Sequence, residues 1–263
     1  MSESKTIFAV DSFIGKDAIV AIKTKGMSII SKSVEMFNGI FDKADEIVSF
    51  GKAINESGMQ MYLSLDMKDI FMSILSETGA DNRMFVRKAE RTIFENVHKL
   101  VTKLQQEGAA PTYVELDTDM FSVVESIKFS FEEQTRIINA VINAVKSAAP
   151  AVKISLANSS ASDNETAKKW FNRFQVSGGK PFDIVTLKFD MNAETFYDMT
   201  LNMSDLSRRF EAEIIIDITG VQSPDDADIS VSDVATAVGL VPLDRGFGII
   251  CSGSLLATGK MVA

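Results

Sequence analysis

The sequence has little of what several protein classes require. Its one cysteine, Cys251, excludes an internal disulfide and a cysteine-based zinc cluster, and we expect it to be a small buried apolar residue. Its one histidine, His98, falls inside a predicted helix, where a packed or solvated surface position is expected instead of a general base at a strand end. These scarcities leave carboxylates and lysines as the main candidates for chemistry.

Long apolar runs and blocks of positive charge are also missing. No run reaches the ~20 residues of a membrane span. The net charge of −9, with no Lys/Arg block, predicts neither nucleic acid nor an anionic membrane as a partner. A polar start precedes residues 7–10 without a signal-peptide pattern. A cytoplasmic protein is therefore expected, or an extracellular one if a signal has been removed.

What is present is the composition of an ordinary globular protein, with 46% hydrophobic and 24% charged residues. A chain of 263 residues buries about 70–75% of its unfolded surface, so it needs no disulfide or metal to fold. The length is close to the roughly 250 residues of one β/α barrel. Length alone would also permit two small domains.

Short β-branched runs alternate with longer helical patterns along the whole chain. The predicted strands are 6–12, 27–34, 59–65, 112–117, 151–157, 183–189, 212–218 and 247–251. The predicted helices are 16–25, 42–57, 82–107, 131–148, 163–177, 195–209, 231–239 and 253–261. Strict alternation of eight strands with eight helices indicates parallel strands joined by right-handed crossovers.

An open doubly wound sheet would fit this alternation too. The count of eight and the length favour closure, and residues 11–16 lack the Gly-rich phosphate loop of a dinucleotide-binding fold. The predicted fold class is therefore α/β, a single (β/α)₈ TIM barrel spanning 1–263 as one domain.

Four segments carry a resemblance to a known family. They are 41–69, which includes Glu-Ser-Gly-Met-Gln-Met-Tyr-Leu-Ser-Leu-Asp, 148–190 with Lys-Trp-Phe-Asn-Arg-Phe, 201–220 with Glu-Ile-Ile-Ile-Asp, and 242–250 with Pro-Leu-Asp-Arg-Gly-Phe-Gly. In this order they resemble the arabinogalactan endo-β-1,4-galactanases, glycoside hydrolase family 53. The resemblance implies a barrel acting on carbohydrate, with a Glu acid/base after strand four and a Glu nucleophile at strand seven.

The positions that the resemblance assigns to chemistry hold other residue types. Asp119 stands at the acid/base position, and Asp217 or Ile218 at the nucleophile position. An arginine pair corresponds to Ser31 and Ser33, a His to Asp66, and a Trp to Ser252, while Asp69 keeps its acid. The side chain of Trp170 has helical spacing with Phe171 and Phe174, so it is expected to pack its helix and not to form a sugar platform.

Retaining glycosidases need carboxyl groups about 5–5.5 Å apart. Asp is one methylene shorter than Glu, and a 1 Å misplacement can cost ~10²-fold in rate. The favoured hypothesis is a pseudoenzyme, a non-catalytic carbohydrate-binding or assembly protein. The alternatives are an active glycoside hydrolase using Asp119 as acid/base and Asp217 as nucleophile, and metal-assisted chemistry at the acidic strand ends.

Acidic residues gather at these strand ends. Glu115, Asp117 and Asp119 alternate along one strand and so point to the same side, and Asp66, Asp190 and Asp217 lie at other strand ends. Lys32 and Lys188, also near strand ends, could offset part of this charge. Ca²⁺ or Mg²⁺ would suit such acids, but a solvated barrel mouth needs no metal, so no metal or cofactor is expected. The candidate ligand-binding residues are Asp66, Asp69, Glu115, Asp117, Asp119, Lys188, Asp190, Asp217 and Ser252. The expected partner is a carbohydrate or an assembly protein, and no oligomeric state is predicted.

Overall fold

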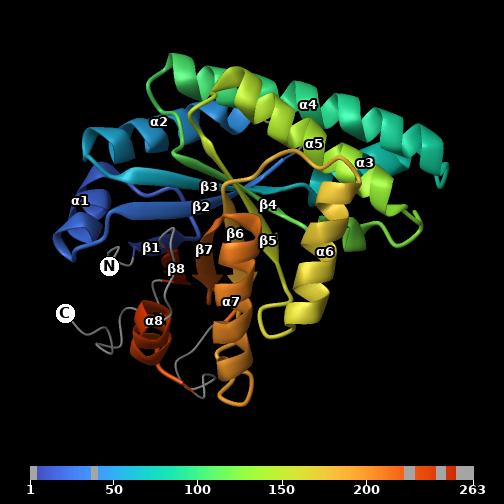
Figure 1. Ribbon diagram of the computed structural model, residues 1–263. Helices are drawn as coiled ribbons and strands as arrows, with labels where there is room; N and C mark the ends of the chain where they lie inside the picture. The colour runs from blue at the N-terminus through green and yellow to red at the C-terminus, as the bar shows by residue number, and fades with distance from the viewer. Residues whose placement is uncertain (1–4, 37–40, 222–228, 241–246, 253–263) are drawn as a thin grey trace.

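Eight parallel strands close into a barrel in the order of the sequence, with β1 hydrogen-bonded to both β2 and β8. The computed structural model describes residues 5–36, 41–221, 229–240 and 247–252 (Figure 1). The strands are β1 Lys5–Val10, β2 Ile29–Glu35, β3 Gln60–Asp66, β4 Tyr113–Asp117, β5 Lys153–Asn158, β6 Ile184–Lys188, β7 Glu213–Asp217 and β8 Phe247–Ser252. The predicted TIM barrel is confirmed, and the open sheet is excluded.

Helices cover the outside of the barrel (Figure 1). They are α1 Lys16–Thr24, α2 Phe41–Glu56, α3 Lys68–Thr78, α4 Asn82–Gln106, α5 Phe131–Ala148, α6 Asn164–Val176, α7 Phe196–Phe210 and α8 Val231–Leu240. The predicted helix at 253–261 lies outside the described residues. None of the described helices combines the length and apolarity that a membrane crossing requires.

The connection from β3 to β4 departs from strict alternation, because it holds two helices, α3 and α4. In α3 the buried residues Ile70, Phe71 and Ile74 have helical spacing, and Gly79 ends the helix with a positive φ of 60°. A short 3₁₀ helix at Met120–Val123, η1, packs against α3 after β4. The prediction of one helix per crossover was therefore wrong at this point.

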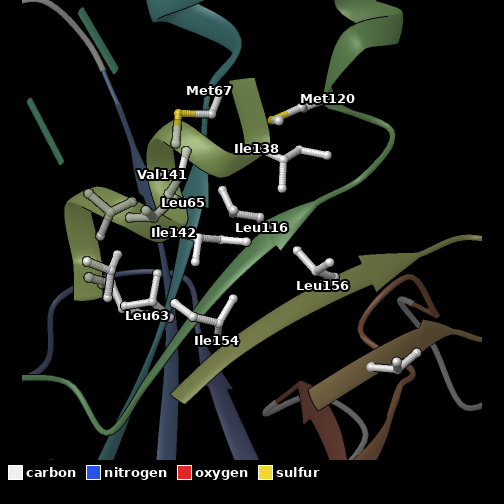
Figure 2. Close-up of a cluster of buried hydrophobic side chains, with 14 of the residues drawn as sticks. Leu63, Leu65, Met67, Leu116, Met120, Ile138, Val141, Ile142, Ile154 and Leu156 are labelled. Atoms are coloured by element: carbon white, nitrogen blue, oxygen red, sulfur yellow. The ribbon is translucent and has the colours of Figure 1, made fainter. Parts of the chain in front are cut away.

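The outward faces of the strands carry apolar side chains, and these faces therefore pack against the helices. Figure 2 shows this packing where β3, β4 and β5 meet α5. The labelled side chains are Leu63, Leu65, Met67, Leu116, Met120, Ile138, Val141, Ile142, Ile154 and Leu156. A capping box fixes the start of α5: Ser130 accepts a hydrogen bond from the backbone of Glu133, whose carboxylate accepts one from the Ser130 N–H.

Three single residues lie as predicted. Cys251 is fully buried, and burial raises the pKa of its thiol to about 12. His98 lies within α4 and stacks on Phe94. Trp170 packs against the core beside Phe171 and Phe174. None of the three lies at a strand end facing the barrel axis.

The inside of the barrel is filled in layers. An apolar plug is formed by Ile7, Ile29, Tyr62, Tyr113, Ile184, Ile215 and Ile250. Next to it, toward the carboxyl ends of the strands, lie shorter and polar side chains from alternate positions, among them Ser31, Glu115, Ser155 and Thr186. The carboxyl ends themselves form what is called the mouth below, the face on which barrel enzymes carry their sites.

Candidate functional site

The floor of the mouth is a buried polar network that joins four strands. The hydroxyl of Tyr62 on β3 donates a hydrogen bond to Glu115 on β4 and lies 3.0 Å from the Thr186 hydroxyl on β6. The Ser155 hydroxyl on β5 lies 2.8 Å from that of Thr186. Tyr62, Ser155 and Thr186 are fully buried, and Glu115 is 6% exposed. The network satisfies polar groups that would otherwise be costly inside the barrel.

Glu115 is the carboxyl group most strongly affected by this environment. Burial raises its pKa to about 6, and the negative charge of Asp217 acts in the same direction. Hydrogen bonds from Tyr62, Thr186 and Ser64 oppose the rise because they stabilise the carboxylate. Burial also raises the pKa of the Tyr62 phenol well above its usual value, so Tyr62 remains a hydrogen-bond donor at neutral pH.

An ion pair crosses the mouth above this network. Lys188 Nζ on β6 lies 2.5 Å from Asp117 Oδ2 on β4, and each side chain is 38% exposed. The strand between them, β5, contributes the small Ala157 beside Asp117, which leaves room for the pair. Burial lowers the pKa of Lys188, but the bond to Asp117 and the charges of Glu115 and Asp119 outweigh it, so the pKa is raised. The sequence expectation that Lys188 offsets the acids of β4 is thereby met.

The side chain of Asp217 at the end of β7 already has partners. Its Oδ1 accepts hydrogen bonds from the backbone N–H of Thr219 at 2.8 Å and from the Thr219 hydroxyl at 2.7 Å. Asp217 pairs in register with Lys188 and contributes to the field at Glu115. Ile218, the other candidate for this position, is fully buried in the outer apolar core. The acid that belongs to the mouth is therefore Asp217.

The remaining predicted ligand-binding residues surround this group without joining it. Asp119 is exposed and immediately precedes η1, and its backbone N–H donates to Asp117 Oδ1. Asp66, which ends β3, and Asp190, which follows β6, are exposed, and each accepts a hydrogen bond from the backbone N–H two residues further on. Asp69 lies in the first turn of α3, and Ser252 ends β8. The structure thus links Glu115, Asp117, Lys188 and Asp217 and leaves the others at the rim.

Lys32 does not join the acids of β4. Ser31 and Ser33 occupy the inward positions of β2, so Lys32 points to the other side of the strand. Its Nζ donates to the backbone carbonyls of Asp11, at 3.1 Å, and Ser33, at 2.7 Å. Burial lowers its pKa, and the charges of Asp11 and Glu35 oppose this effect. Lys32 therefore lies apart from the acids of β4, although it lines one hollow together with Asp66.

Sequence reasoning missed Tyr62 and Thr186, which hold Glu115. Both occupy inward positions of their strands, two residues before Ser64 and Lys188 respectively. Because side chains alternate between the two faces of a strand, this spacing was the signal in the sequence that could have identified them. Among the described residues, no group of three or more His, Cys, Asp or Glu side chains is arranged to hold a metal ion. The arrangement can offer carboxylates, one ammonium and several hydroxyls to a polar ligand.

Comparison with known proteins gives one family. The model of glycosyl hydrolase family 53 matches residues 27–243. A search of curated proteins finds no match.

Solved structures of similar fold include several glycoside hydrolases. A family 53 catalytic domain from Ignisphaera aggregans has a TM-score of 0.65 at 13% identity, covering 95% of this chain and 80% of that one. A family 18 chitinase from Pseudoalteromonas aurantia has a TM-score of 0.61 at 11% identity, covering 95% and 94%. An endo-1,4-β-mannanase from Eisenia fetida has a TM-score of 0.58 at 13% identity, covering 90% and 76%. At these identities the likeness concerns the fold alone.

Proposed function

The chain belongs to glycosyl hydrolase family 53, and from that premise we propose that its barrel mouth binds a β-galactan-type carbohydrate without hydrolysing it. The protein would act as a binding or assembly module on a glycosidase barrel. Family membership supports the carbohydrate as ligand. The residues at the mouth support the absence of hydrolysis.

One observation carries this proposal: the acids that end β4 and β7 are short and already engaged, and Asp119 stands apart from them at the rim. Asp117 is tied to Lys188 across the mouth, and Oδ1 of Asp217 accepts two hydrogen bonds from Thr219. Hydrolysis with retention requires one protonated and one ionised carboxyl group on either side of the glycosidic bond. The acid with a raised pKa, Glu115, lies buried on the floor and is bonded to Tyr62.

The test combines binding with turnover. The protein is titrated with β-1,4-galacto-oligosaccharides by calorimetry and incubated with galactan and an aryl β-galactoside. We expect measurable binding and no release of reducing ends or phenol above a protein-free blank. Hydrolysis that disappears in Asp119→Asn or Asp217→Asn would overturn the proposal, since contaminating activity would survive both substitutions.

The second candidate function is an active hydrolase with Asp119 as acid/base and Asp217 as nucleophile. Its support is the position of these acids, just after β4 and at the end of β7, where the family resemblance puts its glutamates. The exposed side chain of Asp119 would be accessible to a substrate. The same turnover assay decides between the two functions.

A further inference from the structure

We propose that the carbohydrate binds off the barrel axis, in a groove at the rim beside β1, β2 and α2, with Phe13 as its aromatic platform. This inference rests on the proposed function and adds the position and class of the ligand, a neutral oligosaccharide. The groove consists of two adjoining hollows of about 470 and 490 Å³ that share Phe13 and Glu46. It is called the rim groove below.

The size and lining of the rim groove suit a sugar. Each hollow lies within the 300–1,000 Å³ typical of small-molecule sites. The charged side chains of the hollow nearer the mouth are Asp11, Lys32, Glu35, Lys43, Glu46 and Asp66. Carboxylates accept and ammonium groups donate hydrogen bonds, so together they can satisfy the hydroxyls of a sugar.

Phe13 supplies the apolar surface that such a site needs. It is half-buried, and Phe50 fixes its ring edge-to-face at a centroid distance of 5.4 Å. Lys32 Nζ lies 5.5 Å from the ring centroid and is itself held by two backbone carbonyls. A ring held in this way loses little conformational entropy when a sugar packs against it. Two hollows on one ring indicate a ligand longer than a single sugar unit.

Charge favours a neutral ligand in this groove. The hollow nearer the mouth carries both signs, and the chain as a whole has a net charge of −9. An acidic polysaccharide would meet the repulsive field of the whole chain. On the barrel axis, by comparison, Asp117 and Asp217 already have protein partners.

The test measures binding of β-1,4-galactotetraose by calorimetry to the full chain and its variants. Phe13→Leu keeps an apolar contact with Phe50 and removes the aromatic face, and we expect about three- to tenfold weaker binding. Glu35→Gln should also weaken binding. Phe13→Trp should retain binding and add a fluorescence signal at the groove, away from Trp170 on α6. Phe94→Ala, on the exposed side of α4, is the matched aromatic control and should bind like wild type.

The outcomes separate this inference from the proposed function. Binding that is unchanged in Phe13→Leu and Glu35→Gln but lost in Asp117→Asn would overturn the rim groove and leave carbohydrate binding intact. Failure of wild type to bind any neutral oligosaccharide from galactan, mannan or xylan would overturn both. A circular dichroism spectrum and melting temperature for each variant keep loss of folding distinct from loss of binding.

Discussion

At the residue scale, Glu115 makes the free energy of unfolding depend on pH. Its folded-state pKa of about 6 lies above the ordinary 4.5, so the folded protein holds a proton that the unfolded chain has released. The free energy of unfolding therefore contains a contribution that is fully present below pH 4.5 and is lost as the pH rises through about 6. A shift from 4.5 to about 6 corresponds to about 2 kcal/mol.

Glu115→Gln should remove this contribution, because glutamine imitates the protonated acid and cannot ionise. We expect the variant and wild type to have similar unfolding free energies at pH 4, and the variant to be more stable by about 2 kcal/mol at pH 7. Urea denaturation across this range measures the difference. Tyr62→Phe should move the transition to higher pH, because the Tyr62 hydroxyl lowers the pKa of Glu115. A difference independent of pH would contradict this assignment.

A substitution at Lys188 measures how much the ion pair across the mouth contributes to stability. Lys188→Met leaves Asp117 without its cation, but both side chains are 38% exposed, so solvent screens the loss. We expect about 1 kcal/mol of destabilisation at low salt, and less at 1 M salt because the Debye length is then about 3 Å. In an Asp117→Asn background the same substitution should cost less. An equal cost in both backgrounds would mean that the pair contributes nothing.

At the scale of elements, α2 is fixed by a close approach at Gly51. A Cβ added there would lie 2.6 Å from the carbonyl oxygen of Ala109, in the segment before β4. Gly51→Ala should therefore destabilise the protein by about 1–3 kcal/mol through overpacking, although alanine is the better helix former by about 1 kcal/mol. Thermal and urea unfolding measure this change. Gly220→Ala is the control, because its Cβ would meet no atom within 4 Å, and a stabilised Gly51→Ala would refute the contact.

The order of these elements could be predicted because each is encoded locally. The strand predicted at 212–218 is β7, Glu213–Asp217. The helix predicted at 131–148 is α5 in full. The helix α3 was missed because it begins at Lys68, with only Met67 between it and the end of β3 at Asp66, so no loop pattern separates the two. Helix and strand bounds could therefore be predicted where a helix cap or a loop pattern in the sequence separates neighbouring elements.

The candidate site was only partly predictable, because its contacts cross the barrel. Lys188 reaches Asp117 over β5, and Tyr62 reaches Thr186 from β3 to β6. Such contacts depend on strand tilt and stagger, which residue spacing does not specify. Phe13 was overlooked for the same reason, since Phe50 and Lys32 come from different elements. The alternation of side chains along each strand predicted which way they point but not which residues they contact.

At the scale of the whole molecule, the core and the mouth are built from different residues. The outward strand faces and the helices form one continuous apolar core, and the plug inside the barrel forms another. Few members of either core belong to the candidate site. The barrel can therefore keep its fold while the mouth changes its chemistry, as the general independence of fold and function allows.

Ligand binding should accordingly stabilise the whole barrel. A ligand bound only by the folded state, at a free concentration 100 times its dissociation constant, adds about 2.7 kcal/mol. For a domain of this size that raises the melting temperature by roughly 5–10 °C. We expect this shift with β-1,4-galacto-oligosaccharides and none with Mg²⁺, Ca²⁺ or Mn²⁺, because the described residues contain no cluster suited to a metal. Differential scanning calorimetry over a ligand series measures it. A shift with a divalent ion and none with any oligosaccharide would favour metal-assisted chemistry over carbohydrate binding at this mouth.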